Sequence, residues 1–366
     1  MHKVFVSAGE VSGDSHAAAL VNTLKNHVPD ISFWGIGREK LKESGVKLVG
    51  FMEDYDIVGL DGIIKKGPSL YKLTKKVLSL SHGTSLAIYV DYPGYNIFLA
   101  RHFKKLGVKN VYYIAPQVWG WWSFRAKLVK RYFDLVMVIY PFEVDFWKSI
   151  GVEAVYVGNP VYNSIFKEKI EPLPQIPESK KIVGLLPGSR YSEVKRILPH
   201  MLGVKQILEK KYKNLFFLLS LVPDDINVPR DKNLRVIRGK GRSVIKSSDV
   251  LVVASGTATL EAALLEKPMV VLYELSPLSY IIGSMVKKVE YLSLVNIISG
   301  KEVVKEFIQD IKESEVALEV ENLLFDRKKI DVLKGEYRKI KALLKGDAPY
   351  NAAQLIKRRF LYEKDD

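Results

Sequence analysis

Short apolar runs alternate with amphipathic segments of helix length along the whole chain. In the first half, continuous runs rich in Val, Ile, Tyr and Phe are typical of strands that are buried on both faces. They predict strands at residues 4–7, 32–36, 86–90, 111–114, 135–139 and 154–157. The stretches between them predict helices at residues 15–26, 70–81, 97–106 and 142–150. This alternation indicates βαβ units and a parallel sheet.

The pattern is interrupted once and then begins again. Four of the sixteen prolines fall between residues 159 and 181, which predicts an interdomain linker. After this segment, strands are predicted at residues 182–186, 215–219, 234–237, 250–253 and 269–272, and helices at 192–211 and 257–265. From about residue 313 onward the pattern predicts helices only.

We therefore expect an α/β fold with two doubly wound, Rossmann-like parallel-sheet domains that face a cleft. The N-terminal domain spans residues 1–160 and the C-terminal domain spans 161–345. For the helix at residues 346–366, crossing back and mediating dimerisation are the two alternatives. In open α/β sheets, ligands bind beyond the carboxyl ends of the strands, so we seek functional residues in the loops there.

The composition excludes several classes of protein. The chain is 48% hydrophobic and 27% charged, as folded globular proteins are, which excludes wholesale disorder. It has no cysteine, which excludes a disulfide framework, a Cys-ligated metal and a thiol nucleophile. No apolar run approaches the ~20 residues that a membrane-spanning helix needs. We expect a cytoplasmic protein that can still lie on a membrane.

The net charge of +15 is concentrated in one block. Residues 62–133 hold thirteen Lys and Arg and a single acid, for a net charge of +12. The block contains Trp119, Trp121 and Trp122, with Arg125 close behind them, and an earlier segment in which Lys72 and Lys76 stand among apolar residues. Such a block favours an anionic partner. Aromatic residues among cations suit an interfacial membrane contact or stacking on single-stranded nucleic acid, and they also suit a core edge with a solvated face.

Two loops of the N-terminal domain carry candidate catalytic acids. In residues 8–14, Ser12 or Asp14 can cap the next helix, while Glu10 is either a functional acid or a solvated one. Asp91 follows a predicted strand and can act as a general base or cap the next helix; we favour the base. Because Asp91 is the only acid in the basic block, we expect neighbouring cations to keep it ionised.

Two turns of the C-terminal domain suit phosphate groups. Residues 185–190 run from a strand through Gly188 and Ser189 into a helix, with Arg190 beside the free amides. Residues 255–257, which are Ser255, Gly256 and Thr257, open a second helix in the same way, and Glu261 follows one turn later. Two such turns with a carboxylate for ribose hydroxyls predict a nucleoside diphosphate-sugar site.

A metal site is not predicted. Asp54 and Asp56 have the D-x-D spacing of some Mg²⁺ or Mn²⁺ sites, but they precede an apolar segment and lie outside the domain with the phosphate turns. We interpret them as a solvated or capping pair. The six histidines show no ligand spacing.

Six motifs, in order, resemble those of the lipid-A-disaccharide synthase family. They are GEVSGD at 9–14, DYPGYN at 91–96, PQVWGW at 116–121, LLPGSRYSEV at 185–194, SGTATLE at 255–261 and SLVN at 293–296. The resemblance implies a metal-independent glycosyltransferase of the B-type fold that needs no cofactor. It implies inverting transfer of 2,3-diacylglucosamine from UDP to 2,3-diacylglucosamine 1-phosphate, forming a β-1,6 disaccharide. The enzyme would associate peripherally with the inner face of the cytoplasmic membrane, and a homodimer is left open.

The resemblance also suggests roles for individual residues. Asp91 or Glu10 would be the base; the two phosphate turns, Arg190 and Glu261 would hold UDP, with Asn296 near the phosphates or sugar. Asn96 and the cations and tryptophans of the basic block would meet the acceptor and the membrane. The chain departs from the family pattern at three positions, which are Gly94, Trp122 and Asn159.

Two rival functions are kept. A UDP-sugar epimerase on the same architecture would also use paired phosphate turns, but it would need no membrane-facing apolar surface. A nucleic-acid-binding protein would use the basic block, but it would leave both phosphate turns unexplained. We expect no nucleic-acid partner.

Overall fold

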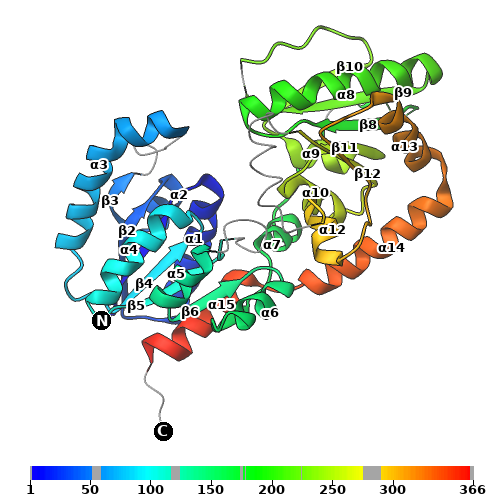
Figure 1. Cartoon of the computed structure of the whole chain (residues 1–366). Helices are drawn as coiled ribbons and strands as arrows, with labels where there is room; N and C mark the ends of the chain where they lie inside the picture. Colours follow the sequence, from blue (N-terminus) through cyan, green and yellow to red (C-terminus); the bar gives the residue numbers. More distant parts are fainter. Residues whose placement is uncertain are drawn as a thin grey trace. The chain divides into compact units, whose positions relative to one another are not determined.

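The computed structural model describes residues 2–51, 59–116, 124–173, 176–177, 179–223, 225–274 and 290–362 (Figure 1). The chain forms two compact units. Unit 1 comprises Met1–Pro160 and Gly346–Asp366, and unit 2 comprises Val161–Lys345. Each unit is a parallel sheet with helices packed on it, and each is described by itself.

Unit 1 contains a seven-stranded sheet with the order β3-β2-β1-β4-β5-β6-β7, in which the neighbouring strands pair in parallel. Its strands are β1 (His2–Ala8), β2 (Ile31–Gly37), β3 (Lys47–Phe51), β4 (Leu86–Val90), β5 (Lys109–Tyr113), β6 (Leu135–Val138) and β7 (Ala154–Tyr156). Its helices are α1 (Val11–His27), α2 (Glu39–Glu43), α3 (Gly59–Ser79), α4 (Pro93–Lys105), α5 (Phe124–Tyr132), α6 (Phe142–Ser149), α15 (Ala348–Ile356) and the π-helix η2 (Lys357–Leu361).

Alternate residues of β1 enter two different cores. Val4, Val6 and Ala8 belong to a buried cluster with residues of α1 and α15, whereas Phe5 belongs to a second cluster with residues of α3, α4, α5 and α6. This is the two-residue periodicity of a strand whose faces are both covered. The continuous apolar runs in the sequence predicted such burial correctly.

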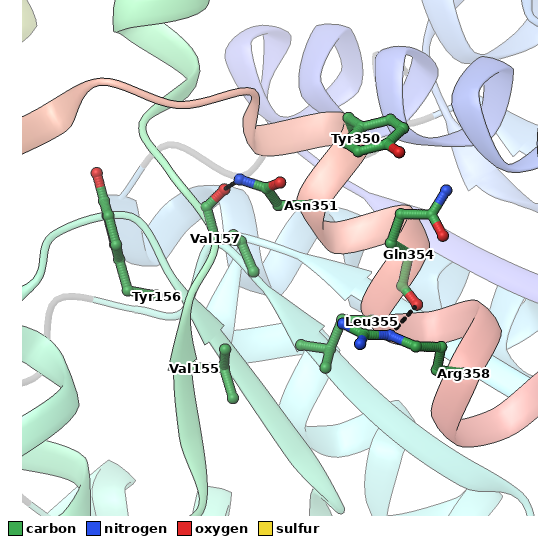
Figure 2. A pocket seen from close by; sticks show the side chains of 8 residues that line it. All are labelled: Val155, Tyr156, Val157, Tyr350, Asn351, Gln354, Leu355 and Arg358. Atoms are coloured by element: carbon green, nitrogen blue, oxygen red, sulfur yellow. Dashed lines mark hydrogen bonds between the residues drawn. The ribbon is translucent and has the colours of Figure 1, made fainter.

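The C-terminal helix packs on unit 1, although it is distant in sequence. Figure 2 shows Asn351 of α15 directed at the end of β7, where its Nδ2 donates to the carbonyl oxygen of Val157 at 3.0 Å. Beside this contact is a cavity of about 450 Å³, and Val155, Leu355 and Arg358 are among the residues that line it. The segment Gly346–Asp366 thus belongs to unit 1, and a role in dimerisation stays a prediction.

Unit 2 contains a six-stranded parallel sheet with the order β10-β9-β8-β11-β12-β13. Its strands are β8 (Lys181–Leu186), β9 (Leu215–Leu221), β10 (Leu234–Arg238), β11 (Val250–Ala254), β12 (Met269–Tyr273) and β13 (Glu306–Ile308). Its helices are α7 (Pro160–Lys167), α8 (Tyr191–Lys211), α9 (Gly241–Ser247), α10 (Thr257–Leu264), α12 (Leu294–Ser299), α13 (Glu313–Phe325) and α14 (Arg327–Leu344). None of the described helices could span a membrane.

The predicted linker was wrong in its first part, because α7 occupies residues 160–167. Pro160 stands at the first helical position, where a proline costs no intrahelical hydrogen bond, so counting prolines alone misled the prediction. Two edge strands, β3 and β13, were not predicted. Both are short, and most of their residues are only partly buried, so their apolar signal is weak.

Candidate functional site

The candidate catalytic loops of unit 1 follow two neighbouring strands. β1 pairs with β4, and the registered pairs end at Ala8 with Val90. The sheet continues to β2 on one side of this pair and to β5 on the other, so the pair is the topological switch point. Ligands bind at the carboxyl ends of the strands at such a point. Glu10 and Asp91, each placed in a loop by the sequence, therefore belong to one site.

The Asp91 turn has an unusual backbone conformation. Asp91 and Tyr92 both have φ of 47°, in the left-handed region that side chains rarely occupy. Asn96 Nδ2 donates to the carbonyl oxygens of Val90 at 3.2 Å and Asp91 at 2.6 Å, and the Tyr112 hydroxyl donates to Asp91 O at 2.9 Å. These bonds hold a strained turn, a feature that clusters at functional sites.

Gly9 is required by the same turn. A Cβ at position 9 would overlap the ring of Tyr92, so only glycine lets the two loops approach this closely. Arg38, which follows β2, donates from Nε to the Gly9 carbonyl oxygen at 2.8 Å. Arg38 was not among the predicted site residues, although its place just after a neighbouring strand could have indicated it.

The electrostatics of Asp91 differ from the prediction. Burial of the carboxyl, and next the negative charge of Glu10, raise the pKa of Asp91 from 3.8 to about 6, opposed by the backbone N–H of Tyr92. The expectation that surrounding cations favour the ionised form of Asp91 was therefore wrong, because burial and Glu10 favour the protonated form. A carboxyl with a pKa about one unit below neutral pH is ionised at neutral pH and is a stronger base than an ordinary aspartate.

Two polar residues near this site have structural partners. Asn96 is fully buried, and its Oδ1 accepts from Ser7 Oγ at 2.5 Å. It therefore shapes the Asp91 turn, and the prediction that Asn96 meets the acceptor or the membrane was wrong. Asp14 is not the cap of α1, which begins at Val11. Its carboxylate instead accepts the N–H groups of Arg38 at 2.6 Å and Leu41 at 3.2 Å at the start of α2.

The residues expected to meet the membrane fall into three groups. Lys72 and Lys76 are exposed on α3. Arg125 is half-buried at the start of α5, near enough to Tyr112 to oppose the rise that burial causes in the pKa of that hydroxyl. The other members, Trp119, Trp121 and Trp122, lie outside the described residues.

The predicted phosphate turns of unit 2 also meet at a switch point. β8 and β11 are neighbours, and the sheet continues to β9 on one side and to β12 on the other. Their carboxyl ends open onto a cavity of about 290 Å³. The predicted residues that line this cavity are Gly188, Ser189, Ser255, Gly256, Thr257 and Glu261. The first amides of α8 and α10 lack intrahelical acceptors, which makes both helix starts suited to an anion.

A second cavity adjoins the first. It has a volume of about 580 Å³, contains residues of the segments before α9 and after α7, and shares Gly241 and Glu261 with its neighbour. Arg242 lines it and donates from Nε to Glu261 Oε1 at 2.8 Å. Arg242 was missed by the sequence analysis, because the motif that contains Glu261 gives no indication of a partner on another helix.

Glu193 in the first turn of α8 was likewise missed as a site residue. The Ser189 N–H, one of the amides predicted to face a phosphate, donates to Glu193 Oε2 at 3.3 Å. Gly188 has φ of 109°, and a Cβ there would overlap the Glu193 carboxylate. The first phosphate turn therefore contains an acid that shares its amide.

Two predicted site residues lie apart from the cavity lining. Asn296 is fully buried; its Nδ2 donates to Val304 O and Glu306 Oε1, both at 2.8 Å, and its Oδ1 accepts from two backbone amides. The predicted contact of Asn296 with phosphates or sugar was therefore wrong. Arg190 is the exposed N-cap residue of α8, and it is not among the described residues that line either cavity.

No group of three or more acids or histidines that could hold a metal is found among the described residues. Asp54 and Asp56 lie outside those residues.

Comparisons with solved structures identify the architecture. The chain is similar to UDP-GlcNAc 2-epimerase from Neisseria meningitidis bound to UDP-GlcNAc, with a TM-score of 0.61 and 13% identity, covering 98% of this chain and 99% of that one. It is similar to spinosyn rhamnosyltransferase SpnG with a TM-score of 0.63 and 11% identity, covering 97% and 100%. The fold is that of B-type glycosyltransferases, and it is shared by a transferase and an epimerase.

Sequence comparisons are more specific. The chain is 38% identical over 339 residues to the lipid-A-disaccharide synthase of Sulfurihydrogenibium sp. (strain YO3AOP1), covering 85% of each chain. It is 36% identical over 387 residues to that of Persephonella marina, covering 98% of this chain and 99% of the relative. The family model for lipid-A-disaccharide synthetase matches residues 4–358. The chain therefore belongs to the lipid-A-disaccharide synthase family.

Proposed function

We propose that this protein transfers 2,3-diacylglucosamine from UDP to the 6-hydroxyl of 2,3-diacylglucosamine 1-phosphate, with inversion, releasing UDP and the β-1,6 disaccharide 1-phosphate. The family supplies the reaction. The observation that carries its assignment to this chain's residues is the Asp91 carboxyl, held in a strained turn at the switch point of unit 1 with its pKa raised to about 6.

In the proposed reaction, Asp91 is the general base. The acceptor oxygen attacks the anomeric carbon while its proton passes to the Asp91 carboxylate, and the bond from the anomeric carbon to the UDP oxygen breaks. Glu10 acts on Asp91 through its charge, which keeps the pKa of Asp91 high. A base with a pKa close to working pH combines a large ionised fraction with a strong pull on the proton.

The donor would bind in the two adjoining cavities of unit 2. The amides at the starts of α8 and α10 face the diphosphate, and their partial positive charge offsets the charge that develops on departing UDP. Arg190 flanks the first turn and adds a full positive charge. Glu261, shared by both cavities, accepts the ribose hydroxyls.

The test is transfer from radiolabelled UDP-diacylglucosamine by the wild type and by Asp91→Asn, Glu10→Gln and Arg190→Ala. We expect loss of about 10²–10⁴-fold in kcat for Asp91→Asn, the usual contribution of a general base. Near-wild-type turnover in both carboxylate variants would show that neither Asp91 nor Glu10 is the general base. Activity that is abolished by EDTA and restored by Mg²⁺ would make Asp54 and Asp56 candidate metal ligands again.

The epimerase rival is examined in the same experiment. An epimerase would convert soluble UDP-N-acetylglucosamine without any acceptor, whereas the proposed transferase should leave it unchanged. Both activities occur on this fold, so the fold does not distinguish them, whereas family membership favours the transferase.

We also propose that unit 1 binds an anionic membrane surface through α3 and α4. Thr74 Oγ1 and the Tyr95 hydroxyl lie 3.1 Å apart and link the two helices. Tyr71 is 61% exposed on α3, and Phe98 is 45% exposed on α4. Exposed aromatic residues beside lysines are typical of an interfacial contact. Bound in this way, the enzyme would reach its diacylated substrates in the membrane.

Co-sedimentation with phosphatidylglycerol vesicles tests this contact. Each lysine near an anionic surface contributes about 1 kcal/mol, so Lys72→Gln with Lys76→Gln should weaken partitioning by about 30-fold. Replacing the exposed Lys210 and Lys213 of unit 2 by Gln changes the net charge equally and serves as the control. Equal losses in both double variants would contradict a specific face.

A further inference from the structure

Arg242, near the start of α9, uses all three guanidinium nitrogens. Its Nε donates to Glu261 Oε1 at 2.8 Å, its Nη1 to Glu168 Oε2 at 2.7 Å and its Nη2 to Ser164 Oγ at 2.8 Å. A guanidinium holds its donors in a rigid planar fork, so three partners in fixed directions define its position. Arg242 therefore joins α7, α9 and α10 in one network.

The network holds one oxygen of Glu261 and leaves the other available. Glu261 Oε2 accepts no hydrogen bond from the residues that the structure describes, and the side chain is 16% exposed. A carboxylate has about four lone-pair sites, so Glu261 retains the capacity to accept two hydroxyl groups. Because Arg242 already orders this side chain, the entropic cost of fixing it falls on folding and not on ligand binding.

The charge of Arg242 has a second effect. Glu261 lines the same cavity as the helix starts that suit a diphosphate, and an unpaired carboxylate there would repel that anion. The guanidinium in contact with Glu261 offsets this repulsion.

We infer that Arg242 is a positioning residue of the nucleotide site: it holds the Glu261 carboxylate in the orientation that accepts the ribose hydroxyls. Arg242 thereby sets the preference of the site for a ribonucleotide over a 2′-deoxyribonucleotide. This inference rests on the proposed function, because it assigns the cavities of unit 2 to UDP.

Calorimetric titration of the full-length protein with UDP and with 2′-deoxy-UDP tests the inference. The wild type should bind UDP about tenfold more tightly than 2′-deoxy-UDP, the effect of one charge-assisted hydrogen bond. Glu261→Gln and Arg242→Gln should each bring this ratio close to one. The double variant should lower it no further, because residues that act as one unit are not additive.

A matched control is available in the same unit. Arg338 Nε donates to Glu266 Oε2 at 3.0 Å, an ion pair of the same kind on α14 that lines neither cavity. Arg338→Gln should leave the ratio unchanged. Arg242→Lys, whose ammonium cannot span three partners, should give a ratio between those of the wild type and Arg242→Gln. Arg242→Lys also tests the inference if Arg242→Gln does not fold.

The outcomes separate the inference from the proposed function. A wild-type ratio in Arg242→Gln or Arg242→Lys overturns the role of Arg242 while UDP binding, and with it the proposed function, stands. A wild type that binds UDP without preferring it overturns the ribose role of Glu261 and this inference. A wild type that does not bind UDP overturns the proposed function itself.

Discussion

Replacing Asp91 by asparagine should stabilise unit 1 while lowering kcat by about 10²–10⁴-fold. Burial and the charge of Glu10 raise the pKa of Asp91 from 3.8 to about 6, so the folded protein disfavours the ionised form. At pH 8 the carboxyl is nevertheless ionised, and the difference between the two values corresponds to about 3 kcal/mol of lost stability. Asparagine removes the charge, keeps an oxygen that can accept the Tyr92 N–H, and tolerates the left-handed backbone.

The raised pKa also determines how the stability gain of Asp91→Asn changes with pH. A carboxyl whose pKa is higher in the folded state binds more protons when folded, so stability falls as the pH rises through the window from 3.8 to about 6. Above that window the whole penalty is present, and below it the penalty disappears. The gain in Asp91→Asn should therefore be about 3 kcal/mol at pH 8 and about 1 kcal/mol at pH 4.5.

Urea unfolding followed by tryptophan fluorescence measures this gain in the correct unit. All five tryptophans lie between residues 34 and 147, within unit 1, so the signal reports its unfolding separately. Asp30→Asn, at an exposed turn, is the control and should change stability little. An Asp91→Asn variant that is no more stable than the wild type at pH 8, or whose gain does not vary with pH, would refute the argument.

Three further predictions follow from the site. The value of kcat/KM should rise with an apparent pKa near 6 as the base ionises, and Glu10→Gln should lower that apparent pKa because one cause of the raised value is removed; an unmoved profile would contradict this. Asn96→Ala should reduce kcat by about 100-fold through misplacement of the Asp91 turn, with calorimetric UDP affinity unchanged. Glu193→Gln should tighten UDP binding about tenfold, since it removes a negative charge beside the Ser189 amide; weaker binding would show that the carboxylate assists the ligand.

The sequence was sufficient to predict the central strands of both sheets, but not which residues of different strands lie close together. The strands of both sheet centres were predicted, because strands buried on both faces are continuous apolar runs. Glu10 and Asp91 were each found as an acid after a strand. That they share one site follows from the pairing of β1 with β4, a contact between residues about eighty positions apart that no local pattern records.

The wrong predictions have a common physical origin. Asn96 and Asn296 stand in motifs, and both were assigned to ligands, but each is fully buried and hydrogen-bonded to backbone groups. A motif residue can be required by the loop that carries the chemistry as well as by the chemistry. The expectation that cations favour the ionised form of Asp91 was wrong for a similar reason, since the count of nearby lysines contains no information about burial or about Glu10.

The two acids of the donor cavity show why the partner of a charge matters more than its position. Glu261 and Glu193 line the same cavity as the helix starts assigned to the diphosphate. Glu261 contacts the Arg242 guanidinium, whereas Glu193 contacts no cation among the described residues and accepts the N–H of Ser189. If the diphosphate binds as proposed, it meets little repulsion from Glu261 but competes with Glu193 for the same amide. In the proposed donor site, binding would accordingly exchange one hydrogen bond for another at the first turn, while at Glu261 it would add bonds to a carboxylate that is already in place.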